Sequence, residues 1–199
     1  MLYLKDGSFR VRGTVRSKAN ATKMDPIKKH FGELFNQLEI VEADLLDDAS
    51  MQRACEGSTY VVHTASPFYF ANQTEEELVK PAVQGTTSVV KACKAYGVKR
   101  LVITSSVAAQ RFGYKMDDPD RPADSVFDES YWTKVDTEGV HAYLKSKTLA
   151  EKAAWDFQAS LPEAERFEIV TILPSLIIGP VLASGDSTSE AIVKSIVAG

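Results

Sequence analysis

The chain alternates short β-branched runs with segments of helical pattern, and this order constrains its fold more than any other feature. Five runs predict strands, at 9–16, 38–45, 60–66, 100–106 and 167–172. Three segments between or after them predict helices, at 47–57, 75–97 and 143–161. Strands alternating with helices of this length are typical of an α/β protein with a doubly wound parallel sheet.

Ligands of such sheets bind outside the carboxyl ends of the strands. That rule gathers a set of polar, charged and small residues along one predicted edge. They are Arg16, Asp44, Thr64, Ala65, Ser66, Ser106 and Pro174. We therefore expect a cofactor cleft at this edge.

Tyr143 and Lys147 stand four residues apart in a helical pattern, so they share one helix face. A phenol has a reference pKa of about 10, and a nearby ammonium lowers that pKa by stabilising the phenolate. Ser106 ends the strand 100–106, where its hydroxyl can hold a carbonyl oxygen against the phenol. The three residues predict a proton-transfer site that interconverts a carbonyl and an alcohol. The alternative is a chance Tyr-x-x-x-Lys on an exposed helix with a snorkelling lysine.

Arg16 ends the second predicted strand of a dinucleotide fold, where an acidic residue binds a ribose hydroxyl and an arginine suits a 2′-phosphate. Lys23 can add charge to the same pocket, and no carboxylate intervenes before Asp25. The pair favours NADPH over NADH as the cofactor. The alternative is that Arg16 is a solvated residue after a strand.

Asp44 and Leu45 follow the next strand, where we expect them beside the adenine. Asp44 can equally cap the helix that starts near Asp47. The small residues Thr64, Ala65 and Ser66 suit a close approach to the cofactor's ribose and pyrophosphate.

Composition excludes several classes of function. A formal charge of −4 argues against nucleic acid and anionic lipid as main partners. The two cysteines are too few for a disulfide framework, and the three histidines lack metal-ligand spacing, so His63 is predicted to be structural. The longest apolar run, 172–183, is too short to cross a bilayer, and the N-terminus carries no signal peptide. We expect a cytosolic protein.

Residues 110–136 depart from the alternating pattern, because they are rich in charge, proline and aromatic side chains. We interpret them as a structured excursion that lines the active site. A surface loop packed by its own aromatics is an equal alternative.

No G-x-G-x-x-G or G-x-x-G-x-x-G occurs among the eleven glycines, although a dinucleotide fold needs such a turn after its first strand. Residues 1–7 instead predict the last turn of a helix that closes on Gly7. We expect the first strand, between 9–16 and 60–66 in the sheet, to lie upstream. The chain is then a fragment that is inactive alone, with a partial nucleotide-binding domain at 1–180 and the start of a substrate domain at 181–199.

The sequence resembles the extended branch of the short-chain dehydrogenase/reductase superfamily, within its dihydroflavonol reductase and cinnamoyl-CoA reductase group. The resemblance rests on short stretches in family order across nearly the whole chain. They are Gly13-Thr-Val-Arg16, Ala43-Asp-Leu45, Val62-His-Thr-Ala-Ser-Pro-Phe68, Ile103-Thr-Ser-Ser106, residues 143–155 and residues 172–180.

The resemblance implies a Rossmann-type fold and catalysis by Ser106, Tyr143 and Lys147, with Lys147 also bonding the nicotinamide ribose. It implies 2′-phosphate contacts by Arg16 and Lys23. The further cofactor positions that it implies are Asp44, Leu45, Thr64, Ala65, Ser66, Pro174, Ile177 and Ser189.

We therefore predict NADPH-dependent reduction of an aldehyde or ketone to an alcohol, with a small carbonyl substrate and no metal. The alternatives are a sugar-nucleotide epimerase or dehydratase, a sterol dehydrogenase on the same fold, and a non-catalytic nucleotide-binding regulator. The substrate and the oligomeric state cannot be read from the sequence.

Overall fold

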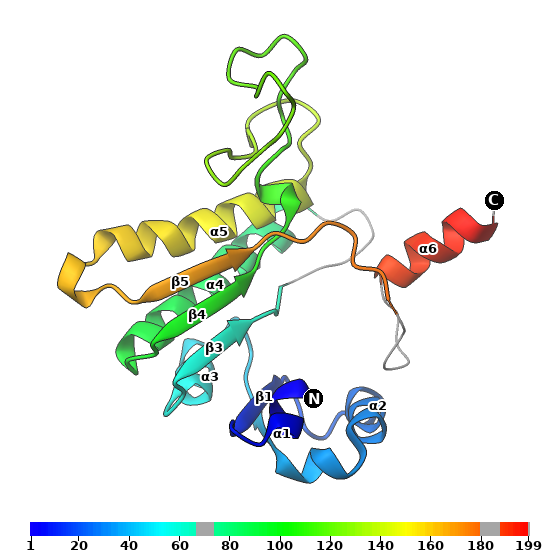
Figure 1. Cartoon of the computed structure of the whole chain (residues 1–199), viewed down its shortest axis with the longest axis vertical. Coiled ribbons are helices and arrows are strands. Elements are labelled where there is room, and N and C mark those ends of the chain that lie inside the picture. Colours follow the sequence, from blue (N-terminus) through cyan, green and yellow to red (C-terminus); the bar gives the residue numbers. More distant parts are fainter. Residues whose placement is uncertain (67–73, 180–187, 199) are drawn as a thin grey trace. The chain divides into compact units, whose positions relative to one another are not determined.

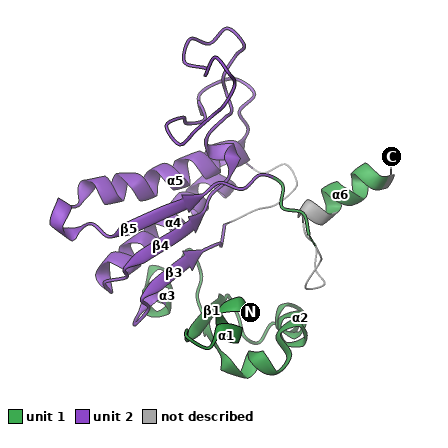
Figure 2. Cartoon of the chain, viewed as in Figure 1, with its two compact units in different colours: residues 1–54, 176–199 green, residues 55–175 purple. Residues whose placement is uncertain are grey.

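The computed structural model describes residues 1–66, 74–179 and 188–198, and the chain divides into two compact units. Residues 1–54 and 176–199 form the smaller unit, and residues 55–175 form the larger one (Figures 1 and 2). The predicted domain boundary after residue 180 lies outside the described residues and stays a prediction.

The smaller unit is built on a two-stranded parallel sheet. Strand β1 (Val11–Val15) pairs with β2 (Leu38–Glu42) in a register that runs from Val11 opposite Leu38 to Val15 opposite Glu42. The remaining elements assigned wholly or mainly to this unit are α1 (Leu2–Asp6), α2 (Ala21–Phe31), η1 (Gly32–Gln37), α3 (Asp48–Cys55) and α6 (Thr188–Ala198). Helix α1 closes on Gly7 at φ 75°, as its glycine predicts.

Helix α2 was not predicted from the sequence, and the reason is Pro26 within it. A proline inside a helical pattern removes one backbone donor and usually signals a boundary. The start signal was nevertheless present, because the Asn20 side chain accepts a hydrogen bond from the Lys23 backbone N–H at 3.2 Å.

The larger unit contains a three-stranded parallel sheet in the order β3 (Tyr60–His63), β4 (Arg100–Thr104), β5 (Glu168–Ile172). Its long helices are α4 (Glu75–Ala95) and α5 (Ala142–Ser160), with short 3₁₀ segments η2 (Val107–Ala109) and η3 (Glu163–Glu165). A capping box starts α4: the Thr74 hydroxyl accepts from the Glu77 N–H at 3.3 Å, and the Glu77 carboxylate accepts from the Thr74 N–H at 2.9 Å.

Helices α4 and α5 pack together against one face of this sheet (Figure 1). Leu101 and Ile103 of β4 and Ile169 of β5 are buried in the sheet, whereas Val62 is 58% and Ile172 52% exposed. The prediction of a parallel α/β fold is confirmed. Double winding is not seen within this unit, because its helices cover one face.

The five described strands form two sheets, β1–β2 and β3–β4–β5. Strands β1 and β3, which were expected to flank a further strand, do not pair with each other. Among the described strands, β1 pairs only with β2, and β3 pairs only with β4. Each therefore has a hydrogen-bonded neighbour on one side only.

Residues 110–139 form the excursion between η2 and α5, and buried Thr133 anchors it. The Thr133 hydroxyl donates to the Ala108 carbonyl at 2.7 Å and accepts from the Phe112 N–H at 3.0 Å. The rings of Tyr114 and Phe127 lie 5.2 Å apart between centroids, and Tyr131 packs edge-on against both. The excursion is therefore structured, and its own aromatic side chains pack it. The two interpretations of its sequence had treated these features as alternatives, but the excursion has both.

Gly113 is required at the base of the excursion on two grounds. Its φ is +81°, and a Cβ there would lie 2.6 Å from the Lys134 carbonyl oxygen. Gly139 has a similar φ of +88°, but a Cβ there would meet nothing within 4 Å.

We expect Gly113→Ala to lower the free energy of unfolding more than Gly139→Ala, as measured by urea titration. Both changes carry the left-handed backbone cost of about 1–2 kcal/mol. Only Gly113→Ala adds a steric overlap, worth about 1–3 kcal/mol more. Equal losses in the two variants would show that the contact with Lys134 relaxes without cost.

Candidate active site

Ser106 lies directly after β4, where the strand gives way to η2. It is buried, and its side-chain oxygen accepts a hydrogen bond from the Ala108 N–H at 3.1 Å. A hydroxyl that accepts on one lone pair still has its hydrogen to donate. Ser106 therefore presents a fixed hydroxyl donor at the carboxyl edge of the sheet.

The chain after β5 is tied to this edge by two backbone hydrogen bonds. The Ser105 N–H donates to the Ile172 carbonyl at 2.8 Å, and the Val107 N–H donates to the Pro174 carbonyl at 3.2 Å. Pro174, a predicted cofactor position, is thereby held beside the segment that carries Ser106.

A buried polar chain ties α5 to the end of β4. The Ser105 hydroxyl donates to the Glu151 carboxylate, which also accepts from the Trp155 indole at 3.3 Å. Glu151 is only 5% exposed, and it stands four residues after Lys147 on the same helix face. Sequence reasoning missed this tether, although the spacing of Tyr143, Lys147 and Glu151 gave a signal for it.

Tyr143 lies in the first turn of α5 and packs against the η2 region. With Phe112 it covers a small buried cluster of Ala108, Val140 and Leu144. Its ring also stacks on His141, with the centroids 6.4 Å apart. Because Ala108 is two residues from Ser106, the tyrosine is brought to the same end of the sheet as the serine.

Lys147 lies one turn further along α5, next to His63 at the end of β3. Burial lowers the pKa of Lys147. Burial, and secondly the positive charge of Lys147, lowers the pKa of His63 to about 4. His63 is therefore neutral at pH 7 and lies close to a predicted catalytic lysine, a proximity that its sequence position alone did not reveal.

Thr64, Ala65 and Ser66 follow β3 at the same edge. Thr64 and Ala65 are exposed, and Ser66 is half-buried. The larger unit thus brings together the predicted residues Ser106, Tyr143, Lys147, Pro174 and this short segment.

Arg16 and Lys23 belong to the smaller unit. Arg16 follows β1 and Lys23 lies in the first turns of α2, and both are exposed. Neither side chain forms an ion pair with a carboxylate among the described residues. Their binding of a 2′-phosphate stays a prediction, and guanidinium and ammonium groups without a carboxylate partner suit such an anion.

Asp44 does not cap α3, so that alternative is wrong. Its carboxylate accepts from the Leu46 N–H at 2.9 Å, closing a turn of its own. Asp47 is the capping residue, because its carboxylate accepts from the Ala49 N–H at 3.0 Å and the Ser50 N–H at 3.2 Å. Asp44 is exposed and Leu45 half-buried at the carboxyl end of β2.

The two remaining predicted positions belong to the smaller unit. Ile177 is 66% exposed, and Ser189 lies in the first turn of α6. The described residues contain no group of three His, Cys, Asp or Glu side chains placed to hold a metal ion. Nor does any described helix combine the length and apolarity needed to cross a membrane.

We expect His63→Gln to remove part of the pH dependence of stability between pH 6.5 and 4. The unfolded chain binds this proton below about pH 6.5, whereas the folded chain binds it only near pH 4. The neutral histidine's contribution is therefore complete above pH 6.5 and is lost as pH falls toward 4, by about 3 kcal/mol in total.

Urea unfolding of wild type and His63→Gln at several pH values measures this difference, with His30→Gln as the control. Parallel pH profiles for wild type and His63→Gln would contradict the assignment.

Comparison with known proteins agrees with this arrangement. The sequence model of the 3-beta hydroxysteroid dehydrogenase/isomerase family matches residues 14–196. Cinnamoyl-CoA reductase CAD2 of Medicago truncatula is 35% identical, over 96% of this chain and 57% of the relative. An anthocyanidin reductase of Vitis vinifera is 36% identical, over 100% of this chain and 57% of the relative.

Among solved structures, the yeast methylglyoxal/isovaleraldehyde reductase Gre2 in complex with NADPH has a TM-score of 0.71. It is 30% identical to this chain, over 89% of the chain and 54% of the yeast protein. The chain thus spans little more than half the length of the relatives that it matches. Its match to the family nevertheless extends over most of its own residues, and dihydroflavonol 4-reductase of Hordeum vulgare aligns with all of it. The chain belongs to the extended short-chain dehydrogenase/reductase superfamily, within the group of dihydroflavonol and cinnamoyl-CoA reductases.

Proposed function

We propose that the protein containing this chain reduces an aldehyde or ketone to an alcohol with NADPH. The observation that carries the proposal is the convergence of three residues within one compact unit. Ser106 follows β4, and Tyr143 packs on the cluster that contains Ala108 of η2. Lys147 lies one helical turn further along α5 and interacts with His63 at the end of β3. Ligands of parallel α/β sheets bind outside the carboxyl ends of the strands.

The three side chains have complementary tasks in carbonyl reduction. The Ser106 hydroxyl donates a hydrogen bond to the carbonyl oxygen and fixes its position. Tyr143 gives its phenolic proton to the same oxygen as charge develops there, and the Lys147 ammonium stabilises the phenolate that remains. NADPH, when bound, supplies the hydride for the carbonyl carbon.

The neutral imidazole of His63 is compatible with the role proposed for Lys147. A second cation beside Lys147 would make the ammonium harder to retain, and a carboxylate there would hold the lysine away from the tyrosine. Because burial keeps His63 neutral at pH 7, the histidine adds no positive charge beside Lys147.

We propose as cofactor-holding residues those that the family resemblance implies. Arg16 and Lys23 would bind the 2′-phosphate, and the free oxygen of the Asp44 carboxylate would accept from the adenine amine with Leu45 beside the ring. The segment Thr64–Ala65–Ser66 would line the ribose and pyrophosphate. Lys147 would bond the nicotinamide ribose, with Pro174, Ile177 and Ser189 completing the set.

A sterol dehydrogenase activity is the second candidate, because the matching family model carries a hydroxysteroid dehydrogenase name. The reductase is favoured by the named relatives, which act on cinnamoyl, flavonoid and small aldehyde compounds. The test incubates the chain, extended to the length of its relatives, with NADPH and a panel of aldehydes, ketones, ketosteroids and nucleotide sugars, and separately with NADP⁺ and hydroxysteroids. Turnover of a steroid or nucleotide sugar alone would overturn the proposal.

We expect Tyr143→Phe in that extended protein to lower kcat by about 10²–10⁴-fold, the usual contribution of a general acid. NADPH affinity should change little, because the ring and its packing remain. Tyr96→Phe, at the exposed end of α4, is the matched control and should leave kcat unchanged. A Tyr143→Phe enzyme that keeps more than a tenth of the wild-type kcat would exclude Tyr143 as the acid.

We expect Arg16→Ala in the same extended protein to weaken NADPH binding by about 10–150-fold. This loss is the equivalent of one charge-assisted hydrogen bond to phosphate. NADH lacks the 2′-phosphate, so its affinity should hardly change. Calorimetric titration with both cofactors measures the difference, and Arg10→Ala, before the opposite end of β1, is the control. Equal losses for NADPH and NADH would sink the 2′-phosphate assignment.

A further inference from the structure

The excursion between β4 and α5 contains a pocket of about 300 Å³. Its lining residues all come from positions 111–127. They are Arg111, Phe112, Tyr114, Arg121, Ser125 and Phe127. No predicted catalytic or cofactor residue lines it, and its volume suits a small molecule.

The two arginines of this pocket have only neutral partners. Arg121 donates to the Met116 sulfur at 2.8 Å and to the Ser125 hydroxyl at 3.2 Å. The Arg111 guanidinium carbon lies 5.4 Å from the centroid of the Phe112 ring. Among the described residues neither arginine forms an ion pair with a carboxylate. The pocket therefore presents two cations that no acid of the described chain neutralises.

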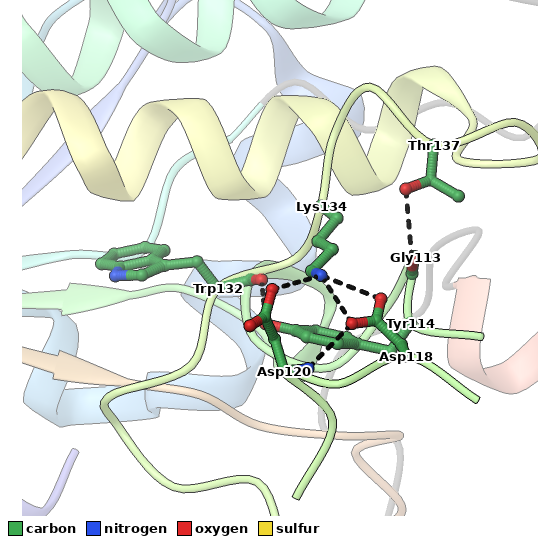
Figure 3. A network of polar contacts seen from close by, with 7 residues as sticks. All are labelled: Gly113, Tyr114, Asp118, Asp120, Trp132, Lys134 and Thr137. Atoms are coloured by element: carbon green, nitrogen blue, oxygen red, sulfur yellow. Dashed lines mark hydrogen bonds and ion pairs between the residues drawn. The ribbon is translucent and has the colours of Figure 1, made fainter. Parts of the chain in front are cut away.

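Two acids of the excursion, Asp118 and Asp120, pair with a lysine that does not line this pocket. Lys134 pairs with Asp118 and Asp120, each at 2.8 Å, and its ammonium lies 4.9 Å from the centre of the Tyr114 ring (Figure 3). These contacts raise the pKa of Lys134 to about 12 and lower that of Asp118. The network fixes one side of Tyr114 and leaves the two arginines without those carboxylates.

Ser125 holds a strained backbone at the same place. With φ at 59° it is the only non-glycine residue of positive φ among the described residues. Its N–H closes a turn onto the Pro122 carbonyl at 2.9 Å, while its hydroxyl accepts from Arg121. Left-handed backbone is unfavourable for a side chain other than glycine, and such strain concentrates at ligand sites. Here it orients the Arg121 guanidinium.

We propose that this pocket binds a small aromatic oxyanion, a carboxylate or phosphate monoester carried on a planar ring. The guanidinium fork matches both anions, and the Phe112, Tyr114 and Phe127 rings supply an aromatic wall. Residues 110–139 carry eight acidic and four basic side chains, so the excursion repels an anion at long range and the direct contacts must provide the affinity. The inference does not depend on the reductase activity, because it needs neither cofactor nor turnover.

The test titrates the 199-residue chain, without cofactor, with phenyl phosphate and with benzoate, followed by the backbone amide resonances. Benzyl alcohol tests the ring without the charge, and inorganic phosphate tests the charge without the ring. We expect saturable binding of at least one aromatic anion with a Kd of about 1 mM or tighter. Both control compounds should bind at least about tenfold more weakly, because each lacks one half of the recognition. The relative affinities of the two aromatic anions identify which oxyanion the pocket prefers.

Arg111→Gln and Arg121→Gln should each weaken binding by about tenfold or more, the loss of one charge-assisted hydrogen bond. Lys115→Gln is the matched control, because Lys115 is an exposed cation of the same excursion that does not line this pocket. If Arg121→Gln unfolds the excursion, the wild-type titration decides, because the shifted amides must centre on Arg111, Arg121 and Ser125. Absence of saturable binding, or equal affinity for benzyl alcohol, would overturn the proposal.

Discussion

A buried polar junction holds the excursion and α5 to the chain after β4, and the active-site end of the larger unit depends on it. The Thr133 hydroxyl donates from the excursion to the Ala108 carbonyl at 2.7 Å. A buried carbonyl left without a donor carries the full desolvation cost, so losing the Thr133 contact would destabilise the η2 turn. Ser106 caps η2, and the turn is thereby held beside the helix that bears Tyr143. Ser105 and Glu151 link the chain after β4 directly to the same helix.

This junction also sets the electrostatics of the candidate site. Packing α5 against the end of β4 partly buries Lys147, and this burial lowers its pKa. The positive charge of Lys147 also acts on the buried His63 of β3. Lys145, two residues earlier, instead pairs with Glu75 of α4. The two lysines therefore have different roles: Lys145 joins α5 to α4, and Lys147 lies close to the end of β3.

Sequence reasoning located the helices and strands that local sequence patterns determine. The β-branched runs and closing glycines gave β1–β5, α3, α4 and α5 to within a few residues, because strand period and helix termini are short-range properties. Side-chain contacts between distant segments could not be predicted in this way. The sequence around His63 does not indicate its proximity to Lys147, and the helical spacing of Glu151 indicates its face but not its partner Ser105. Helix α2 was missed because Pro26 obscured a correct cap at Asn20. For the excursion, the aromatic content was visible, but the pairing of Tyr114, Phe127 and Tyr131 depends on a turn at Ser125 that propensity disfavours.

The positions of the unpaired lysines and arginines determine where this molecule can bind an anion. With 27 acidic and 23 basic side chains, the chain has enough carboxylates to pair every lysine and arginine. Lys134 takes two carboxylates, while Arg16, Lys23, Arg111 and Arg121 form no ion pair among the described residues. An exposed ion pair contributes little stability, so leaving these cations unpaired costs the fold little. The same cations become strong donors once an oxyanion arrives, because charge-assisted bonds to phosphate or carboxylate are the strongest hydrogen bonds available to a protein surface. Unpaired arginines and lysines thus give an acidic protein the capacity to bind anions.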